Sequence, residues 1–189
     1  MKLSEMKNIS LFFVILLLIV LIFVSRKEGL VTSIDEEITV PIKNDKVVRI
    51  QLNNQLRPGQ AQPFGDAWIN LGDITLRDKD GNQINYGNTN NVYFGNKGNW
   101  GGLPVQQLWD NDKVSLGHAS REYENLIINL NPVELGSVQI TNRQDCCEKR
   151  IGNYEMALYN DNNERIGYTK LENLVGLGKT VRYNMSYPK

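Results

Sequence analysis

Residues 126–140 read LIINLNPVELGSVQI, and the spacing of the apolar side chains in this stretch decides the fold class. The apolar side chains recur at alternate positions, at Leu126, Ile128, Leu130, Val138 and Ile140. Successive side chains of an extended strand point to opposite faces of a sheet. A two-residue period therefore indicates strands with one buried face.

The same period appears on both sides of this stretch. It recurs at Val48, Ile50, Leu52, Ile74, Leu76, Tyr154, Met156 and Leu158. Turn-forming residues at 78–81 and 161–163 separate these runs, and 85–104 is rich enough in Gly and Asn to predict a long loop. No segment after residue 25 has a sustained helical period. We therefore predict an all-β fold, a β-sandwich of the jelly-roll type, over residues 38–189.

The composition excludes several classes of function. Lys+Arg and Asp+Glu are both 21, so the chain lacks the basic excess of a nucleic-acid-binding protein, and we expect no nucleic-acid partner. The single histidine, His118, rules out a Cys/His zinc pattern. The sequence has no recognisable nucleophile–base pair, metal triad or phosphate loop, so we predict that the protein is not an enzyme.

The N-terminal region contains an apolar run that predicts a membrane helix. Residues 11–24 read LFFVILLLIVLIFV, and residues 9–25 form the predicted transmembrane helix. A cleaved signal peptide is the alternative, but no small-x-small cleavage site follows the run. The predicted organisation is a tail at 1–8, the membrane helix at 9–25 in contact with lipid, a stalk at 26–37 and the sandwich at 38–189. Basic residues on both sides leave the orientation open.

The most specific motif joins the lone histidine to a basic cluster. Twenty-four residues separate His118 from Arg143, and Arg143-x-Asp145 is followed after four more residues by Arg150. Two arginines and a histidine offer several hydrogen-bond donors to the hydroxyls of a neutral sugar. Asp145 can orient a neighbouring arginine through charge-assisted hydrogen bonds.

This spacing resembles that of the F-type lectins (fucolectins), which belong to the discoidin-related, galactose-binding-like sandwiches. The resemblance covers roughly residues 47–172, with 47–81 similar to strands that close the family's domain, so that the order looks circularly permuted. Similar modules occur in animal lectins and in virion proteins of large DNA viruses. The Asn-rich turns and the permuted order resemble the viral kind more closely.

The resemblance implies a set of carbohydrate-binding residues, which are His118, Arg143, Asp145, Cys146, Cys147 and Arg150. A structural or protein-contact role for the same stretch is the alternative. A disulfide between the adjacent cysteines would present sulfur to an apolar sugar face. Such a bond requires backbone distortion and an oxidising setting, and free thiols are the alternative in a reducing compartment.

The resemblance also implies a structural calcium ion, held by Asp73, Asp110 and Asp112. Calcium prefers such oxygen ligands, although the Asp-Asn-Asp sequence is equally that of a turn. We expect Trp68 and Trp109 to act as core or loop anchors. Trp100, which lies among glycines, is the best candidate for an exposed contact.

Two functional hypotheses follow. The first is a non-enzymatic structural protein of a large DNA virus particle, anchored in an internal or envelope membrane, whose sandwich contacts capsid or neighbouring virion proteins. The alternative is a membrane-tethered lectin that recognises fucose-like glycans. The two are compatible, because a lectin-like fold can be reused as a structural block.

Overall fold

The computed structural model describes residues 33–61, 63–87, 91–96, 98–110, 112 and 114–188. The predicted tail at 1–8 and membrane helix at 9–25 lie outside these residues, as does most of the predicted stalk at 26–37. Within the described part of the chain, no helix has the length and apolar character that crossing a membrane requires. Residues Ile34–Lys189 form one compact unit.

The described residues fold into β-strands and three short 3-10 helices, with no α-helix. The strands are β1 (Glu36–Pro41), β2 (Val47–Asn54), β3 (Asn70–Asp78), β4 (Val92–Phe94), β5 (Gly117–His118), β6 (Leu126–Val133), β7 (Leu135–Asn142), β8 (Tyr154–Tyr159), β9 (Arg165–Lys170) and β10 (Thr180–Ser186). The 3-10 helices are η1 (Val105–Trp109), η2 (Arg150–Asn153) and η3 (Glu172–Leu174).

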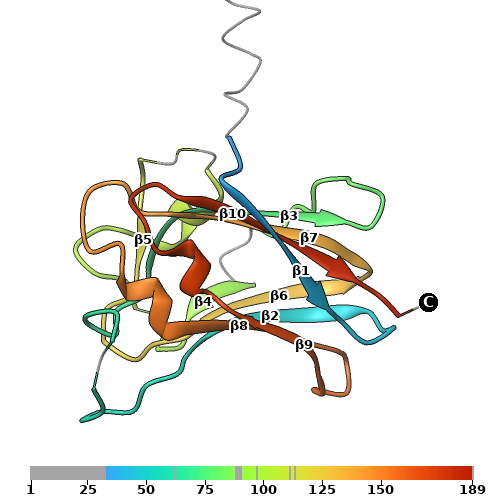
Figure 1. The fold of residues 1–189 in the computed structure, drawn as a ribbon, viewed down its shortest axis with the longest axis horizontal. Helices are drawn as coiled ribbons and strands as arrows, with labels where there is room; N and C mark the ends of the chain where they lie inside the picture. Colours follow the sequence, from blue (N-terminus) through green and yellow to red (C-terminus); the bar gives the residue numbers. More distant parts are fainter. Residues whose placement is uncertain are drawn as a thin grey trace, which may run out of the picture. The chain divides into compact units, whose positions relative to one another are not determined.

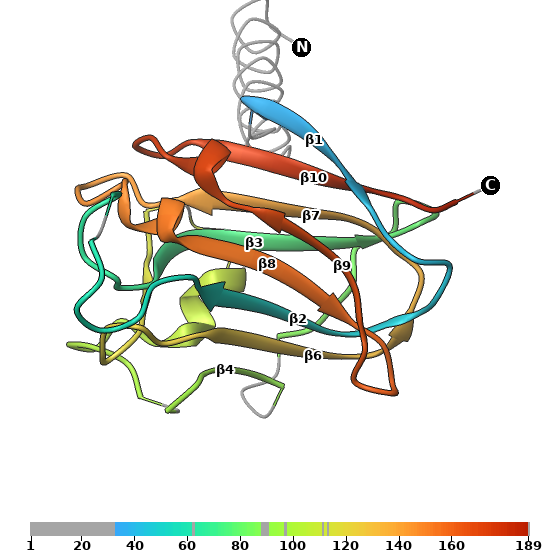
Figure 2. The ribbon, with the colours of Figure 1, turned by 60° about the horizontal axis from the view of Figure 1, so that its bottom comes forward.

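The strands form two five-stranded sheets that face one another as a β-sandwich (Figure 1). One sheet has the order β1-β10-β7-β3-β5 and the other β4-β6-β2-β8-β9. All pairs are antiparallel except that of β1 with β10, which is parallel. The loops that follow β2 and β7 gather at one end of the sandwich, at the left of Figure 2 and away from the C-terminus. This end carries His118, Arg143 and Arg150.

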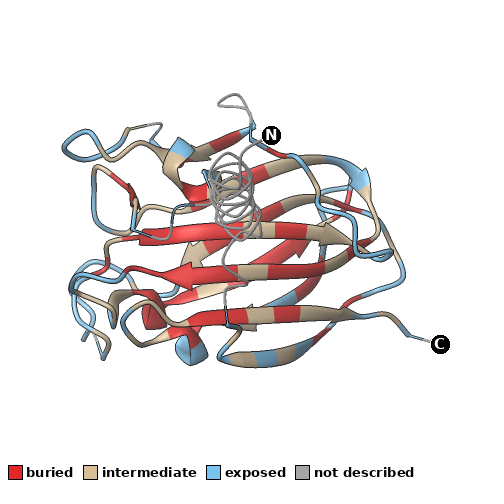
Figure 3. Cartoon of the chain, turned by 90° about the horizontal axis from the view of Figure 1, so that it is seen from above, coloured by how far each residue is buried: buried red, intermediate tan, exposed pale blue. Residues whose placement is uncertain are grey.

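The core lies between the sheets and confirms most of the alternation predicted from the sequence. Buried side chains run along the strands, and exposed ones concentrate in the connections (Figure 3). Ile50, Ile74, Ile140 and Leu158 are each at most 2% exposed. The all-β prediction is therefore confirmed for the described residues.

Two details differ from the sequence prediction. We expected Val48 to share a face with Ile50, but Val47 is the buried residue and Val48 is only half-buried. The pairing of β2 with β6 shifts between Val47 and Arg49, and such an irregularity moves side chains to the other face. The long loop predicted at 85–104 is also interrupted, because Val92–Phe94 pairs with β6 as strand β4.

Candidate functional site

Three residues predicted from the motif come from different segments and meet at one end of the sandwich. His118 ends β5, Arg143 follows the last residue of β7, and Arg150 begins η2. Strand β3 pairs with both β5 and β7, so the ends of the three strands are side by side. Strand pairing therefore brings together residues that are far apart in the sequence.

Asn70, the first residue of β3, joins these three side chains. It pairs with His118 across the β3–β5 ladder and is 2% exposed. With its amide oxygen facing the arginines, Asn70 accepts hydrogen bonds from Nη1 of Arg143 at 3.1 Å and from Nη1 of Arg150 at 3.2 Å. The opposite orientation would set amide N–H groups against guanidinium donors, which excludes it on chemical grounds. Asn70 thus joins the two guanidinium groups and lies beside His118.

Each arginine is also paired with an aspartate. Nε and Nη2 of Arg143 donate to the two carboxylate oxygens of Asp145, each at 2.7 Å. These hydrogen bonds lower the pKa of Asp145 to about 2. Nη2 of Arg150 donates to Asp66 at 2.9 Å. The four formal charges cancel, and the bonds fix both guanidinium planes.

His118 offers a hydrogen-bond acceptor beside these donors. Its Nδ1 lies 2.7 Å from the carbonyl oxygen of Ala119. A carbonyl oxygen can only accept, so Nδ1 carries the proton, and Nε2 of the neutral ring is left as an acceptor. Burial lowers the pKa of His118, and the positive charges of Arg143 and Arg150 lower it further, against the opposing effects of the Ala119 bond and Asp145. The neutral form is thereby favoured.

Two tryptophans flank the imidazole ring. The ring centroid of Trp68 lies 5.3 Å from that of His118, and the centroid of Trp100 lies 5.4 Å from it. Trp68 is half-buried and donates from Nε1 to Glu122 at 3.1 Å. Trp100 is 56% exposed, as predicted from its glycine-rich surroundings. Trp109 instead packs edge-on against Tyr86.

Buried asparagine side chains hold the loops that carry the site. The amide of Asn142 donates to the carbonyl oxygens of Glu148, Leu174 and Gly176, at 2.7, 3.1 and 3.1 Å. It therefore ties the loop after β7 to the loop before β10. Asn153 similarly donates to the carbonyl oxygen of Gly65, next to Asp66. Such polar groups supply the backbone partners that irregular buried segments need.

Cys146 and Cys147 lie in the same loop and are free thiols in the structure. Cys146 is exposed, and its hydrogen bond with Cys147 raises the pKa of the Cys146 thiol. Cys147 has a φ of 59°, in the left-handed region, so the backbone is already distorted there. The disulfide between them stays a prediction.

The predicted calcium ligands occupy other surroundings. Asp110 accepts hydrogen bonds from Ser115 Oγ and from the backbone N–H of Asp112, which are contacts of a turn. Asp73 lies on β3 and accepts a hydrogen bond from Thr75. The described residues contain no group of three or more His, Cys, Asp or Glu side chains that could hold a metal ion. The structure does not bring the three aspartates together in such a group, and calcium stays a prediction.

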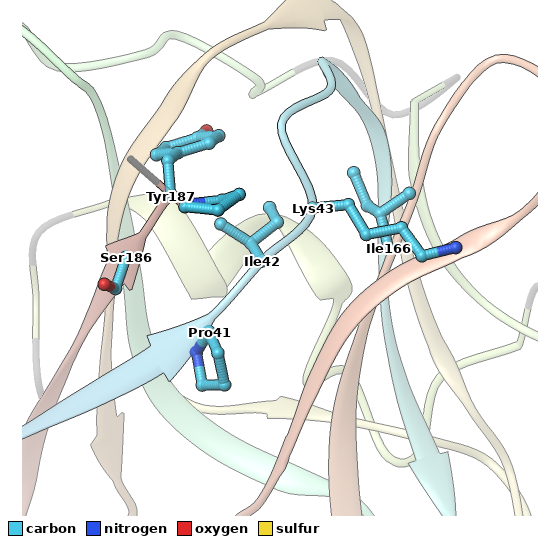
Figure 4. A pocket seen from close by; sticks show the side chains of 7 residues that line it. Pro41, Ile42, Lys43, Ile166, Ser186 and Tyr187 are labelled. Carbon is cyan, nitrogen blue, oxygen red and sulfur yellow. The ribbon is translucent and has the colours of Figure 1, made fainter.

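An apolar groove lies at the opposite end of the sandwich. Pro41, Ile42 and Ile166 line it together with Tyr187, next to the end of β10 (Figure 4). The register of β1 and β10 sets this groove at the far end of the sheet from Arg143. It shares no residue with the polar cluster.

Comparison with known proteins returned no match to any family model, curated protein or solved structure. The sequence pattern predicts His118, Arg143 and Arg150 as site residues but does not indicate Asn70 or Asp66. Neither carries a local signal, because each becomes part of the site only through pairing with segments 48 or more residues away.

Proposed function

We propose that this protein is a non-enzymatic binding module that recognises a neutral sugar through His118, Arg143 and Arg150. The convergence of both guanidinium groups on Asn70, beside His118, is the observation that carries the proposal. The sandwich would be of the galactose-binding-like jelly-roll type, as the resemblance to F-type lectins predicts. Its binding residues lie at one end, where loops are free to differ between proteins that share a fold.

The chemistry of the cluster matches a pair of sugar hydroxyls. A hydroxyl is both donor and acceptor, so one group can accept from an arginine Nη while donating to Nε2 of His118. Fixed donors and acceptors discriminate between hydroxyl arrangements because a misplaced hydroxyl leaves a buried polar group unpaired. The nearby indole rings supply an apolar surface for C–H groups.

The charge balance of the site favours a neutral ligand over an anionic one. Asp145 and Asp66 already compensate the two arginines, and their hydrogen bonds occupy part of each guanidinium group. A carboxylate or sulfate brought here would meet two resident carboxylates at close range. We therefore expect neutral glycans to bind in preference to sialylated or sulfated ones.

A glycan array probed with the full-length protein in detergent tests this proposal. We expect neutral glycans to give signal with the wild type and to lose it with Arg150→Gln. Arg165→Gln is the matched control, because Arg165 also pairs with a carboxylate, that of Glu155, but lies on β9 and makes no contact with Asn70 or Asp66. Absence of signal from every neutral glycan, or equal loss in both variants, would reject the proposal.

A structural role in a large DNA virus particle is a second proposal, with a membrane anchor at residues 9–25. The observation that favours it is the outer face of the sheet formed by β4, β6, β2, β8 and β9. This face carries tyrosine and arginine, which are residue types enriched at protein interfaces. Arg49 lies over the ring of Tyr159 at 4.3 Å, and Arg165 lies over the ring of Tyr168 at 4.4 Å. Tyr168 is 55% exposed. Mass spectrometry of purified particles tests this role, and absence of the protein from them would contradict it.

A further inference from the structure

Exposed apolar side chains lie on two sides of the polar cluster. Among the described residues the exposed large hydrophobic side chains are Trp100, Val114, Tyr168 and Leu177. Two of these, Trp100 and Leu177, belong to segments that are hydrogen-bonded directly to residues of the site. Both side chains therefore present apolar surface next to the polar binding groups, and a ligand that covered them would gain the free energy of burial.

Trp100 is fixed to the strand that carries His118. Its backbone N–H donates to the carbonyl oxygen of His118 at 3.0 Å, and the N–H of His118 donates to Leu103 at 3.1 Å. The N–H of Leu103 in turn donates to Trp100 at 2.9 Å. Gly101 and Gly102, with φ of 54° and 79°, form the turn between them. The backbone that carries the exposed indole is therefore held by hydrogen bonds to His118 and Leu103.

Leu177 is held in the same way on the opposite side. The N–H of its neighbour Gly178 donates to the carbonyl oxygen of Arg143 at 2.8 Å. The carbonyl oxygen of Gly176, on its other side, accepts a hydrogen bond from Asn142 at 3.1 Å. Leu177 itself is 58% exposed.

The order of strands sets the length of the whole arrangement. The loop with Leu177 precedes β10, Arg143 follows β7, Asn70 begins β3 and His118 ends β5, and these strands are consecutive in the sheet. Asn99 forms a bridge with Ala119, so Trp100 lies one further position beyond β5. Neighbouring strands lie about 4.8 Å apart, so the four strand spacings between the Leu177 loop and Trp100 span about 19 Å. This length exceeds that of one sugar ring.

We infer that the site takes an extended glycan of two or more neutral sugar rings. One ring binds Arg143, Arg150 and His118 through its hydroxyls, and adjoining rings contact Trp100 and Leu177 through their C–H faces. The inference rests on the proposed sugar-binding function and specifies the size of the ligand. Linked subsites of this kind raise affinity because the second contact is made within an already formed complex.

Calorimetric titration with a monosaccharide and with matched oligosaccharides tests the inference. The probes are the methyl glycoside of the sugar that terminates the strongest array ligands and neutral di- and trisaccharides that contain this sugar. The full-length protein is compared with Trp100→Ala and Leu177→Ala. Tyr168→Ala is the matched control, because Tyr168 is an aromatic of nearly equal exposure on the other sheet.

We expect the wild type to bind the trisaccharide at least about tenfold more tightly than the methyl glycoside, equivalent to about 1.4 kcal/mol. Trp100→Ala or Leu177→Ala should remove most of this gain, and Tyr168→Ala should retain it. Equal affinities for the methyl glycoside and the trisaccharide, or an unchanged ratio in both site variants, would overturn the inference and leave the proposed function standing. Failure of the wild type to bind any probe would overturn both.

Discussion

Replacing Asn70 with alanine should destabilise the protein, because Asn70 is the acceptor that both site arginines share. The substitution removes the amide oxygen that accepts from Nη1 of Arg143 at 3.1 Å and from Nη1 of Arg150 at 3.2 Å. Two charged donors are then left facing a position that is only 2% exposed in the native protein. A buried donor that loses its partner costs the free energy of its desolvation.

The magnitude follows from the exposure of the two arginines. Hydrogen bonds to charged groups contribute about 1.5–3 kcal/mol each. The Arg143 side chain is 7% exposed and regains little water, whereas that of Arg150 is 19% exposed and regains more. We expect a loss of about 2 kcal/mol at Arg143 and about 1 kcal/mol at Arg150. The sum of about 3 kcal/mol corresponds to a Tm lower by about 6–12 °C for a chain of this size.

Thermal unfolding followed by near-ultraviolet circular dichroism measures this change in the full-length protein. Asn53→Ala is the matched control, because Asn53 is a half-buried strand asparagine of β2 outside the site, and we expect a change within about 0.5 kcal/mol. A Tm of Asn70→Ala equal to that of the control would contradict this prediction. It would mean that the two guanidinium groups do not depend on the Asn70 oxygen.

Three further predictions concern pH and packing. Lowering the pH from 7.5 to 4 should weaken sugar binding, because protonation turns Nε2 of His118 from acceptor to donor. The pKa of His118 is lowered from 6.5, so the affinity should begin to fall only below pH 6.5. The stability that the neutral ring contributes should fall over the same range. Calorimetry showing constant affinity down to pH 4 would contradict this. Asn142→Ala removes the amide contacts with three carbonyl oxygens and the hydrogen bond that Oδ1 accepts from the N–H of Arg143, and should lower the free energy of unfolding by about 2–3 kcal/mol in urea titrations. A change under about 0.5 kcal/mol would contradict the role of Asn142 in joining the two loops. Gly136→Ala would drive a Cβ into the carbonyl oxygen of Asp78 and should lower the free energy of unfolding by about 1–3 kcal/mol in the same assay. Wild-type stability of this variant would show that the backbone at Asp78 can move away from the added Cβ without cost.

The sequence predicted the strands well where alternation was undisturbed. Ile74 and Leu76 of β3, and Val138 and Ile140 of β7, are buried as expected, because each pair keeps the two-residue period across the ladder. Val48 was assigned to the wrong face because of the register shift between Val47 and Arg49. This shift arises in the pairing of β2 with β6, so the sequence of β2 alone does not predict it. Strand β4 was missed because three residues among Asn and Gly give too short a pattern.

The site was predicted only in part, for a related reason. The spacing of His118, Arg143 and Arg150 is visible in one segment of the sequence, and the structure brings these residues together. Asn70 and Asp66 precede His118 by about 50 residues. The pairing of β3 with β5 places Asn70 beside His118, and the ion pair with Arg150 brings Asp66 to the site. Nothing in their local sequence separates them from other Asn and Asp residues of turns and strand ends.

A crystal structure of the full-length protein with its strongest array ligand would show whether Arg143, Arg150 and His118 bind the hydroxyls of a neutral sugar. We predict sugar oxygens within hydrogen-bond distance of a guanidinium nitrogen of each arginine and of Nε2 of His118. A glycan bound elsewhere, for example in the groove lined by Pro41 and Tyr187, with the arginine cluster filled only by water, would contradict it.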